Sequence, residues 1–174
     1  MAAASDPFAI YAAKALAELA DADALAGVGE EGRGGDPMGA VALVSAGTFP
    51  DAAAEALGKA LAALGFDAGS AFTIVSRPEG VRLGAAPARL RLALEAVDAP
   101  LVLAVDAEAG QDLAAAFGVD RLDPGLPVRS FGRVLGAVGD FAESLADPKS
   151  KTRAWAAIRA VAAAAGHTTQ TKRL

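Results

Sequence analysis

Cysteine is absent from the 174 residues of this chain, and histidine occurs once, as His167. The lack of cysteine excludes disulfides, thiolate zinc sites, iron–sulfur clusters and cysteine nucleophiles. A Ser-His-Asp triad or a histidine-rich metal centre would need His167 to fold back from the polar C-terminal segment 167–174. We therefore expect no metal or other cofactor.

Aromatic residues make up only 5% of the chain, so alanine, leucine and valine must fill its core. No apolar run approaches the roughly 20 residues of a membrane-spanning helix, and the first residues lack the charge and apolar stretch of a secretion signal. These features predict a cytoplasmic protein. The net charge of −5 argues against strong non-specific affinity for nucleic acid. A local basic patch remains open.

Four short apolar runs alternate with helical patterns between residues 1 and 166, which predicts one α/β domain followed by a polar tail at 167–174. The run at 40–46 is apolar without alternation, as expected of a central strand buried on both faces. We expect the runs at 72–75 and 101–105 to flank it, with 134–138 as a fourth strand. Right-handed crossovers then give a three-layer α/β/α fold with a four-stranded parallel sheet.

Capping patterns place several helices. Asp6 and Pro7 predict a helix from Pro7 to about Ala26, and Asp147 followed by proline predicts the start of a final helix that ends by Gly166. Thr48, three residues before Asp51, is expected to cap the helix after the central strand. The glycine-rich segment 27–39 is expected to be a flexible loop, and segment 123–127 a connection.

Polar and small residues follow the strands and should meet at the carboxyl edge of the sheet, where open α/β folds bind ligands. The candidate pocket consists of Ser45, Gly47, Thr48, Phe49, Ser76, Arg77, Asp106, Asp140 and Phe141. Two chemistries are open for this edge. Its hydroxyl groups and Arg77 could hold a phosphate, and Asp106 with Asp140 could hold a divalent cation.

Several segments share a pattern with one known family. The run 145–155, Leu-Ala-Asp-Pro-Lys-Ser-Lys-Thr-Arg-Ala-Trp, resembles the passage Leu-Leu-Arg-Asn-Pro-x-x-Lys-Arg-x-Ala-Trp of the uracil-DNA glycosylase superfamily, most closely its bacterial iron–sulfur branch. Segment 101–109 resembles the third-strand motif, segment 61–67 the helix end before the second strand, and 76–78 the family's Cys-Arg-Pro. The resemblance covers roughly 40–165 in the family's order and implies the same fold.

The positions that carry glycosylase chemistry differ from the family. Ala46 stands where the family's first motif, Gly-Glu-x-Pro-Gly, has its acidic residue, and Asp106 stands at the glycine of the third-strand motif. Asp140 occupies the histidine position of His-Pro-Ser, and the cluster-binding cysteines are absent. A carboxylate there would oppose the negative charge that the family histidine stabilises on the departing base. The resemblance therefore implies a degenerate member without catalytic residues.

Such a protein would bind a partner protein or nucleic acid in DNA repair or replication. The same fold serves without catalysis in an accessory subunit of a bacterial replicative polymerase, which is an analogy of fold alone. The alternative function is a nucleotide- or phosphate-binding protein, or an enzyme, that uses the strand ends.

Basic residues crowd the first turns of the predicted final helix, where the helix dipole favours acidic ones. We interpret Lys149, Lys151 and Arg153, joined by Arg133, as a candidate nucleic-acid patch. The alternative is an exposed helix face on which the small unfavourable dipole energy has no consequence.

Overall fold

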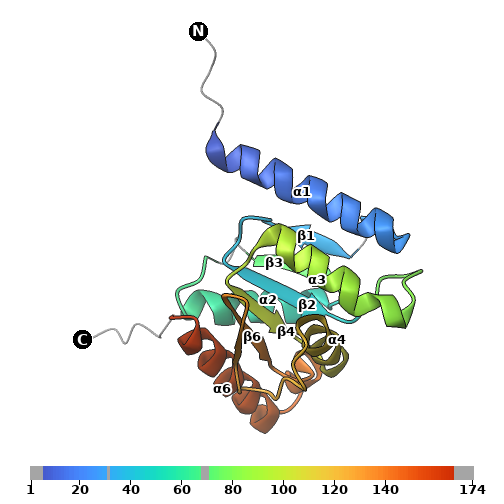
Figure 1. The fold of residues 1–174 in the computed structure, drawn as a ribbon. Coiled ribbons are helices and arrows are strands. Elements are labelled where there is room, and N and C mark those ends of the chain that lie inside the picture. The colour runs from blue at the N-terminus through green and yellow to red at the C-terminus, as the bar shows by residue number, and fades with distance from the viewer. Residues whose placement is uncertain (1–5, 31, 68–70, 167–174) are drawn as a thin grey trace.

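A six-stranded sheet forms the centre of the computed structural model, which describes residues 6–166 except residue 31 and residues 68–70 (Figure 1). The sheet order is β1-β3-β2-β4-β6-β5. The strands are β1 (Arg33–Gly35), β2 (Val41–Ser45), β3 (Ala71–Val75), β4 (Leu101–Ala104), β5 (Val128–Ser130) and β6 (Arg133–Ala137). The helices are α1 (Pro7–Ala26), α2 (Asp51–Ala63), α3 (Ala86–Val97), α4 (Ala107–Phe117), α5 (Phe141–Ser144) and α6 (Pro148–Ala164), with a 3₁₀ turn, η1 (Leu83–Ala85), before α3.

The middle of the sheet is parallel, as the sequence predicted. Strand β2 lies between β3 and β4, with Val41 opposite both Ala71 and Leu101, and β4 pairs in parallel with β6. Every residue of β2 is buried. The uninterrupted apolar run therefore identified the central strand correctly.

The prediction of four parallel strands is wrong at both edges, where a short antiparallel strand is added. Strand β1 pairs with β3 inside the segment expected to be a flexible loop, and β5 pairs with β6. Glycine permits the first pairing, because Gly35 has a φ of +94° and a Cβ there would lie 2.1 Å from the carbonyl oxygen of Ala71. The glycines of this segment thus allow close strand contact.

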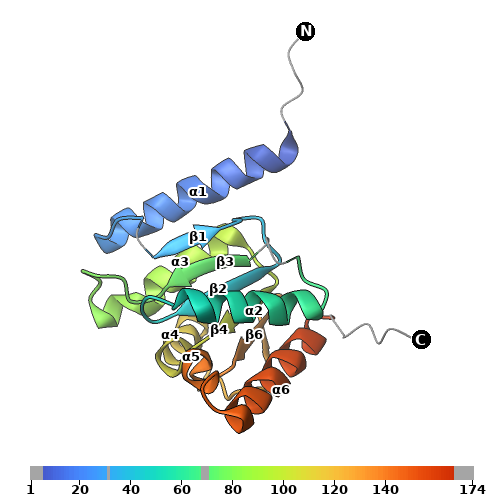
Figure 2. The same ribbon diagram turned by 180° about the vertical axis from the view of Figure 1, so that it is seen from behind.

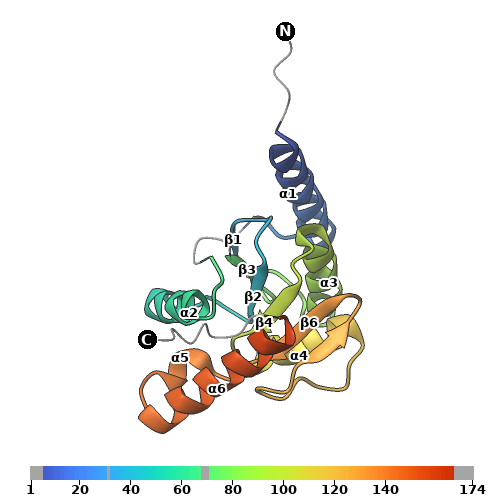
Figure 3. The ribbon, with the colours of Figure 1, turned by 90° about the vertical axis from the view of Figure 1, so that its left-hand side faces the viewer.

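Helices cover both faces of the sheet, which gives the predicted three layers (Figures 2 and 3). Helices α1, α3 and α4 enclose one core, around residues such as Val44, Ile74 and Leu94. Helices α2, α5 and α6 enclose the other, around Leu43, Leu57 and Ile158. Among the described residues, none of the helices combines the length and hydropathy that a bilayer crossing requires.

The helix starts match the sequence in two of three cases. Asp6 accepts a hydrogen bond from the backbone N–H of Phe8, and Asp147 accepts one from Ser150, so α1 and α6 begin where predicted. Thr48 does not cap α2. That helix begins at Asp51, and its N-cap residue is Pro50, which is extended and makes no side-chain capping hydrogen bond. Thr48 lies two residues before this N-cap. The short helix α5 was not predicted.

Candidate functional site

A cavity of about 180 Å³ lies at the carboxyl ends of the strands, where the sequence placed its candidate pocket. Its walls contain six residues of that prediction, namely Ser45, Gly47, Thr48, Phe49, Asp106 and Asp140, together with Pro50, Ala142 and Glu143. Parallel strands bring their carboxyl ends to one edge of the sheet, so residues as far apart in sequence as Ser45 and Asp140 meet here. Ser45, at the end of β2, is buried, whereas Gly47 and Thr48 are exposed.

Three predicted pocket residues do not line this cavity. Phe141 is buried in the core under α6, with its ring centroid 6.4 Å from that of Phe49. Ser76 is fully buried and donates a hydrogen bond of 2.7 Å to Asp112 on α4. Arg77, the cation of the phosphate hypothesis, turns to the same helix.

Two carboxylates hold the Arg77 guanidinium. Its Nε and Nη2 donate to the two oxygens of Asp112 at 2.8 and 3.0 Å, and its Nη1 lies 2.8 Å from Glu108. The hydrogen bonds that Arg77 donates to Asp112, more than the nearby charges, raise the pKa of Arg77 above its ordinary value. This network fastens the end of β3 to α4. The sequence could not show it, because Asp112 gave no local signal.

Asp106 acts as a two-sided link between a strand and a helix. Its Oδ1 accepts the N–H of Ala109 at 2.7 Å and so caps α4, while its Oδ2 accepts the N–H of Ala46 at 2.8 Å. Both oxygens therefore satisfy backbone donors, one at the start of a helix and one at the end of β2. This is a structural role, and it accounts for an acidic residue at the cavity.

We expect Asp106→Ala to lower the free energy of unfolding by about 2 to 3 kcal/mol, because it removes a helix cap and a second charge-assisted hydrogen bond. Asp106→Asn retains one acceptor oxygen and should lose roughly half as much. Urea unfolding followed by circular dichroism measures both variants. An alanine variant at least as stable as the parent would contradict the structural role, since removal of a strained ligand-binding carboxylate stabilises a protein.

The cavity carries acidic side chains and lacks a basic one in its lining. Asp140 accepts the N–H of Ala107 through Oδ1 at 3.0 Å, and Glu143 is exposed at the rim. An anion entering beside Asp106, Asp140 and Glu143 would be repelled. For the cation hypothesis, the described residues contain no group of three or more His, Cys, Asp or Glu side chains placed to hold a metal ion.

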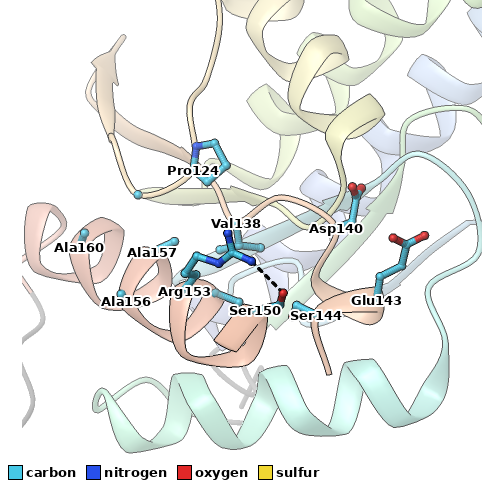
Figure 4. Close-up of a pocket in the computed structure, with 12 residues that line it drawn as sticks. Pro124, Val138, Asp140, Glu143, Ser144, Ser150, Arg153, Ala156, Ala157 and Ala160 are labelled. Carbon is cyan, nitrogen blue, oxygen red and sulfur yellow. Dashed lines mark hydrogen bonds between the residues drawn. The ribbon is translucent and has the colours of Figure 1, made fainter. Parts of the chain in front are cut away.

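A larger groove of about 750 Å³ borders this site between α6 and the chain at Pro124 and Gly125 (Figure 4). Alanines of α6 form one wall, and Val138 lies at its base. Arg153 reaches into the groove and donates to the Ser150 hydroxyl at 3.0 Å, while the Asp140 and Glu143 carboxylates lie at the other end. This groove could not be predicted from the sequence, because alanines at helical spacing resemble an ordinary buried face.

The predicted basic patch is divided by the structure. Lys149, Lys151 and Arg153 are exposed in the first turns of α6. There the Ser150 hydrogen bonds, helped slightly by the Arg153 charge, lower the pKa of the capping residue Asp147. Arg133 does not join them. It is buried at the start of β6, the opposite end of that strand from the one that leads to α5 and α6. There its Nη2 donates a hydrogen bond of 2.6 Å to Asp98.

Comparison with known proteins adds no relative. No protein-family model matches the chain, and a search of curated proteins found no significant match. A relationship to the uracil-DNA glycosylase superfamily is therefore a proposal, supported by the residue patterns and by the arrangement of the strands.

Proposed function

We propose that this chain is a non-catalytic relative of the uracil-DNA glycosylases. It binds either single-stranded DNA or a partner protein that acts in DNA repair or replication. Two features support the relationship. The family-like segments occur in the family's order along the chain, and the strands they accompany, β3, β2, β4 and β6, form a continuous parallel sheet. The segment most like the family, 145–155, forms the start of α6.

The observation that carries the non-catalytic part is the bonding of the two strand-end carboxylates. Asp106 and Asp140, at positions where the resemblance places glycosylase motifs, both accept backbone N–H groups. Ala46, at the acidic position of the first motif, is buried and carries no ionisable group. Excision requires a group that activates water and a donor that stabilises the departing base. Ala46 cannot activate water, and Asp140 accepts a hydrogen bond where the resemblance places the donor.

The alternative of a phosphate or nucleotide site at the strand ends has less support. Arg77 would have to leave Asp112 and Glu108 to reach a phosphate, and the cavity that remains is lined by carboxylates. Electrostatic repulsion at about 4 Å amounts to roughly 4 kcal/mol at an effective dielectric of 20. That repulsion exceeds the gain expected from one helix N-terminus.

The start of α6 is the surface that fits a nucleic-acid backbone. An open hollow of about 550 Å³ is lined by Pro148, Lys149, Thr152 and Arg153. Two cations and a hydroxyl beside a shallow surface are the groups that contact phosphates. Lys151 is exposed in the same turns but lies about 200° around the helix from Lys149, outside this hollow, where it adds to the positive potential of the helix start.

We expect weak binding to single-stranded DNA that Lys149→Glu together with Lys151→Glu abolishes. Phosphate contacts from the two cations of the hollow, Lys149 and Arg153, predict a logarithmic salt slope near −1.4, which is roughly a 7-fold loss of affinity between about 50 and about 200 mM salt. The melting temperature of the double variant should be equal or slightly higher, because glutamate suits the start of a helix better than lysine does. Fluorescence anisotropy with a labelled oligonucleotide measures the binding.

The matched control is Lys14→Glu with Lys59→Glu, which makes the same change of net charge at exposed sites on α1 and α2. This control should retain most of the binding if the contact is local to α6. Equal losses in both double variants would show attraction by overall charge. No detectable binding by the unmodified chain at low salt would contradict the nucleic-acid form of the proposal and leave a partner protein.

A further inference from the structure

The groove beside α6 has an apolar middle and polar ends (Figure 4). Ala156, Ala157 and Ala160 line it from the helix, and Pro124 lines it from the opposite side. The two sides touch at Ala157, since a Cβ added to Gly125 would lie 3.3 Å from the Ala157 Cα. An alanine side chain ends at its Cβ, so a flat ring can lie close against this wall. The volume of about 750 Å³ is within the range of small-molecule sites.

The carboxylates at one end of the groove have acceptor oxygens to spare. Asp140 accepts the Ala107 N–H through Oδ1, and no donor of the described residues reaches its Oδ2. The Glu143 side chain is exposed and forms no hydrogen bond or ion pair within the same part of the chain. An ionised carboxylate only accepts hydrogen bonds. This end of the groove therefore suits a ligand that presents N–H donors and disfavours one that presents a carbonyl oxygen.

Arg153 joins the groove to the basic hollow at the start of α6. It lines both cavities, and Lys149 lines the hollow beside it. One Arg153 nitrogen donates to the Ser150 hydroxyl at 3.0 Å, which holds the guanidinium at the groove. Guanidinium planes stack on unpaired bases, and their N–H groups contact phosphates. A strand with a phosphate in the hollow would thus have a neighbouring base beside the groove.

From this arrangement we infer that the groove holds one unstacked base of the bound strand and selects a base with an exocyclic amino group. Cytosine has an amino donor at N4 where thymine has an acceptor at O4, and Asp and Glu side chains accept from cytosine N4. Asp140 and Glu143 would bind the amino group and repel the thymine oxygen. A base is uncharged, so the repulsion that keeps a phosphate away from these carboxylates does not exclude it. This inference rests on the single-stranded DNA form of the proposed function and adds a base preference to it.

Fluorescence anisotropy with cytosine and thymine oligonucleotides of equal length, at low salt and neutral pH, tests the inference. Phosphate contacts are the same in both strands and carry no sequence information, so a difference in affinity reports on the bases. The unmodified chain should bind the cytosine strand about fivefold more tightly, the lower end of what one base contact provides. Competition with free dCMP and dTMP distinguishes a base read within a strand from a free nucleotide. Displacement by dCMP alone would support the amino preference and show that one nucleotide is enough.

Two sets of variants locate the preference. Asp140→Asn with Glu143→Gln places amide groups, which both donate and accept, where only acceptors stood. The ratio of the two affinities should fall to about one, and the melting temperature should be kept because asparagine can still accept the Ala107 N–H. Ala156→Leu should lower the ratio in the same way by filling the groove. Its control is Ala163→Leu, the same change at an exposed site of α6 outside the groove lining, which should keep the ratio.

The possible failures separate this inference from the proposed function. Equal affinity of the unmodified chain for the two strands would overturn the base preference and leave the binding of single-stranded DNA intact. A cytosine preference that survives in the amide double variant would also overturn it, since the amino group would then be read elsewhere. An absence of binding to either strand would overturn both the inference and the nucleic-acid form of the proposed function.

Discussion

Replacing Asp23 with alanine should lower the free energy of unfolding by about 3 to 5 kcal/mol, the range expected when one partner of a buried ion pair is removed. Asp23 is buried on α1, and its Oδ1 accepts two hydrogen bonds from Arg89, at 3.0 Å from Nε and 2.6 Å from Nη2. The Arg89 side chain is only 1% exposed. Without Asp23, its charge would remain buried with one further bond, to the carbonyl oxygen of Val75.

A second arginine makes the effect of this variant larger. Arg33 of β1 places its Nε 2.8 Å from Asp23 Oδ2, an ion pair whose atoms are not aligned as a hydrogen bond. Asp23 thus joins α1, the edge strand β1 and α3. Urea unfolding measures the loss, and hydrogen exchange should show α1 and β1 opening first.

Glu30→Ala is the matched control for Asp23. Glu30 contacts the same Arg33 at 3.2 Å but is 84% exposed, so its removal should cost less than about 1 kcal/mol. Similar small losses for both variants would contradict the view that the buried network fixes α1 to the body of the protein.

The other large effect concerns uracil excision, which we expect to be absent. A carboxylate about 4 Å from the oxygen of a departing base would oppose its negative charge by roughly 4 kcal/mol at an effective dielectric of 20. That energy corresponds to about a thousandfold loss of rate, before the alanine at the acidic position of the first motif, Ala46, is considered. Asp140 lines the cavity and uses one oxygen to accept the Ala107 N–H, so in this arrangement it serves as an acceptor, whereas the reaction needs a donor.

The parallel core of the sheet could be predicted because its strands are uninterrupted apolar runs. The edge strands could not. Arg33-Gly34-Gly35 carries no apolar pattern, and its pairing depends on a glycine that allows close contact with β3. Strand β5 is equally short, and its two-residue turn begins with Phe131, which lacks the usual turn signal.

The site shows a similar division between what is local in sequence and what is not. Six of the nine residues predicted at the strand ends line one cavity, because the topology brings those ends to one edge, whereas Ser76, Arg77 and Phe141 do not. Their bonding partners could not be predicted. Asp112 holds Arg77 from 35 residues away, and the Ala46 N–H that Asp106 accepts is 60 residues away. Arg133 was assigned to the wrong surface because a positive charge in sequence does not reveal the buried contact with Asp98.

A single-turnover assay of uracil release tests the non-catalytic account most directly. Excess purified protein is incubated with single- and double-stranded DNA that contains uracil, and free base is quantified. The account predicts no release above that of a mock preparation, for the unmodified chain and for Asp140→Ala alike. Release of uracil by the unmodified chain that disappears in Asp140→Ala would contradict it, because Asp140 would then have to take part in the chemistry.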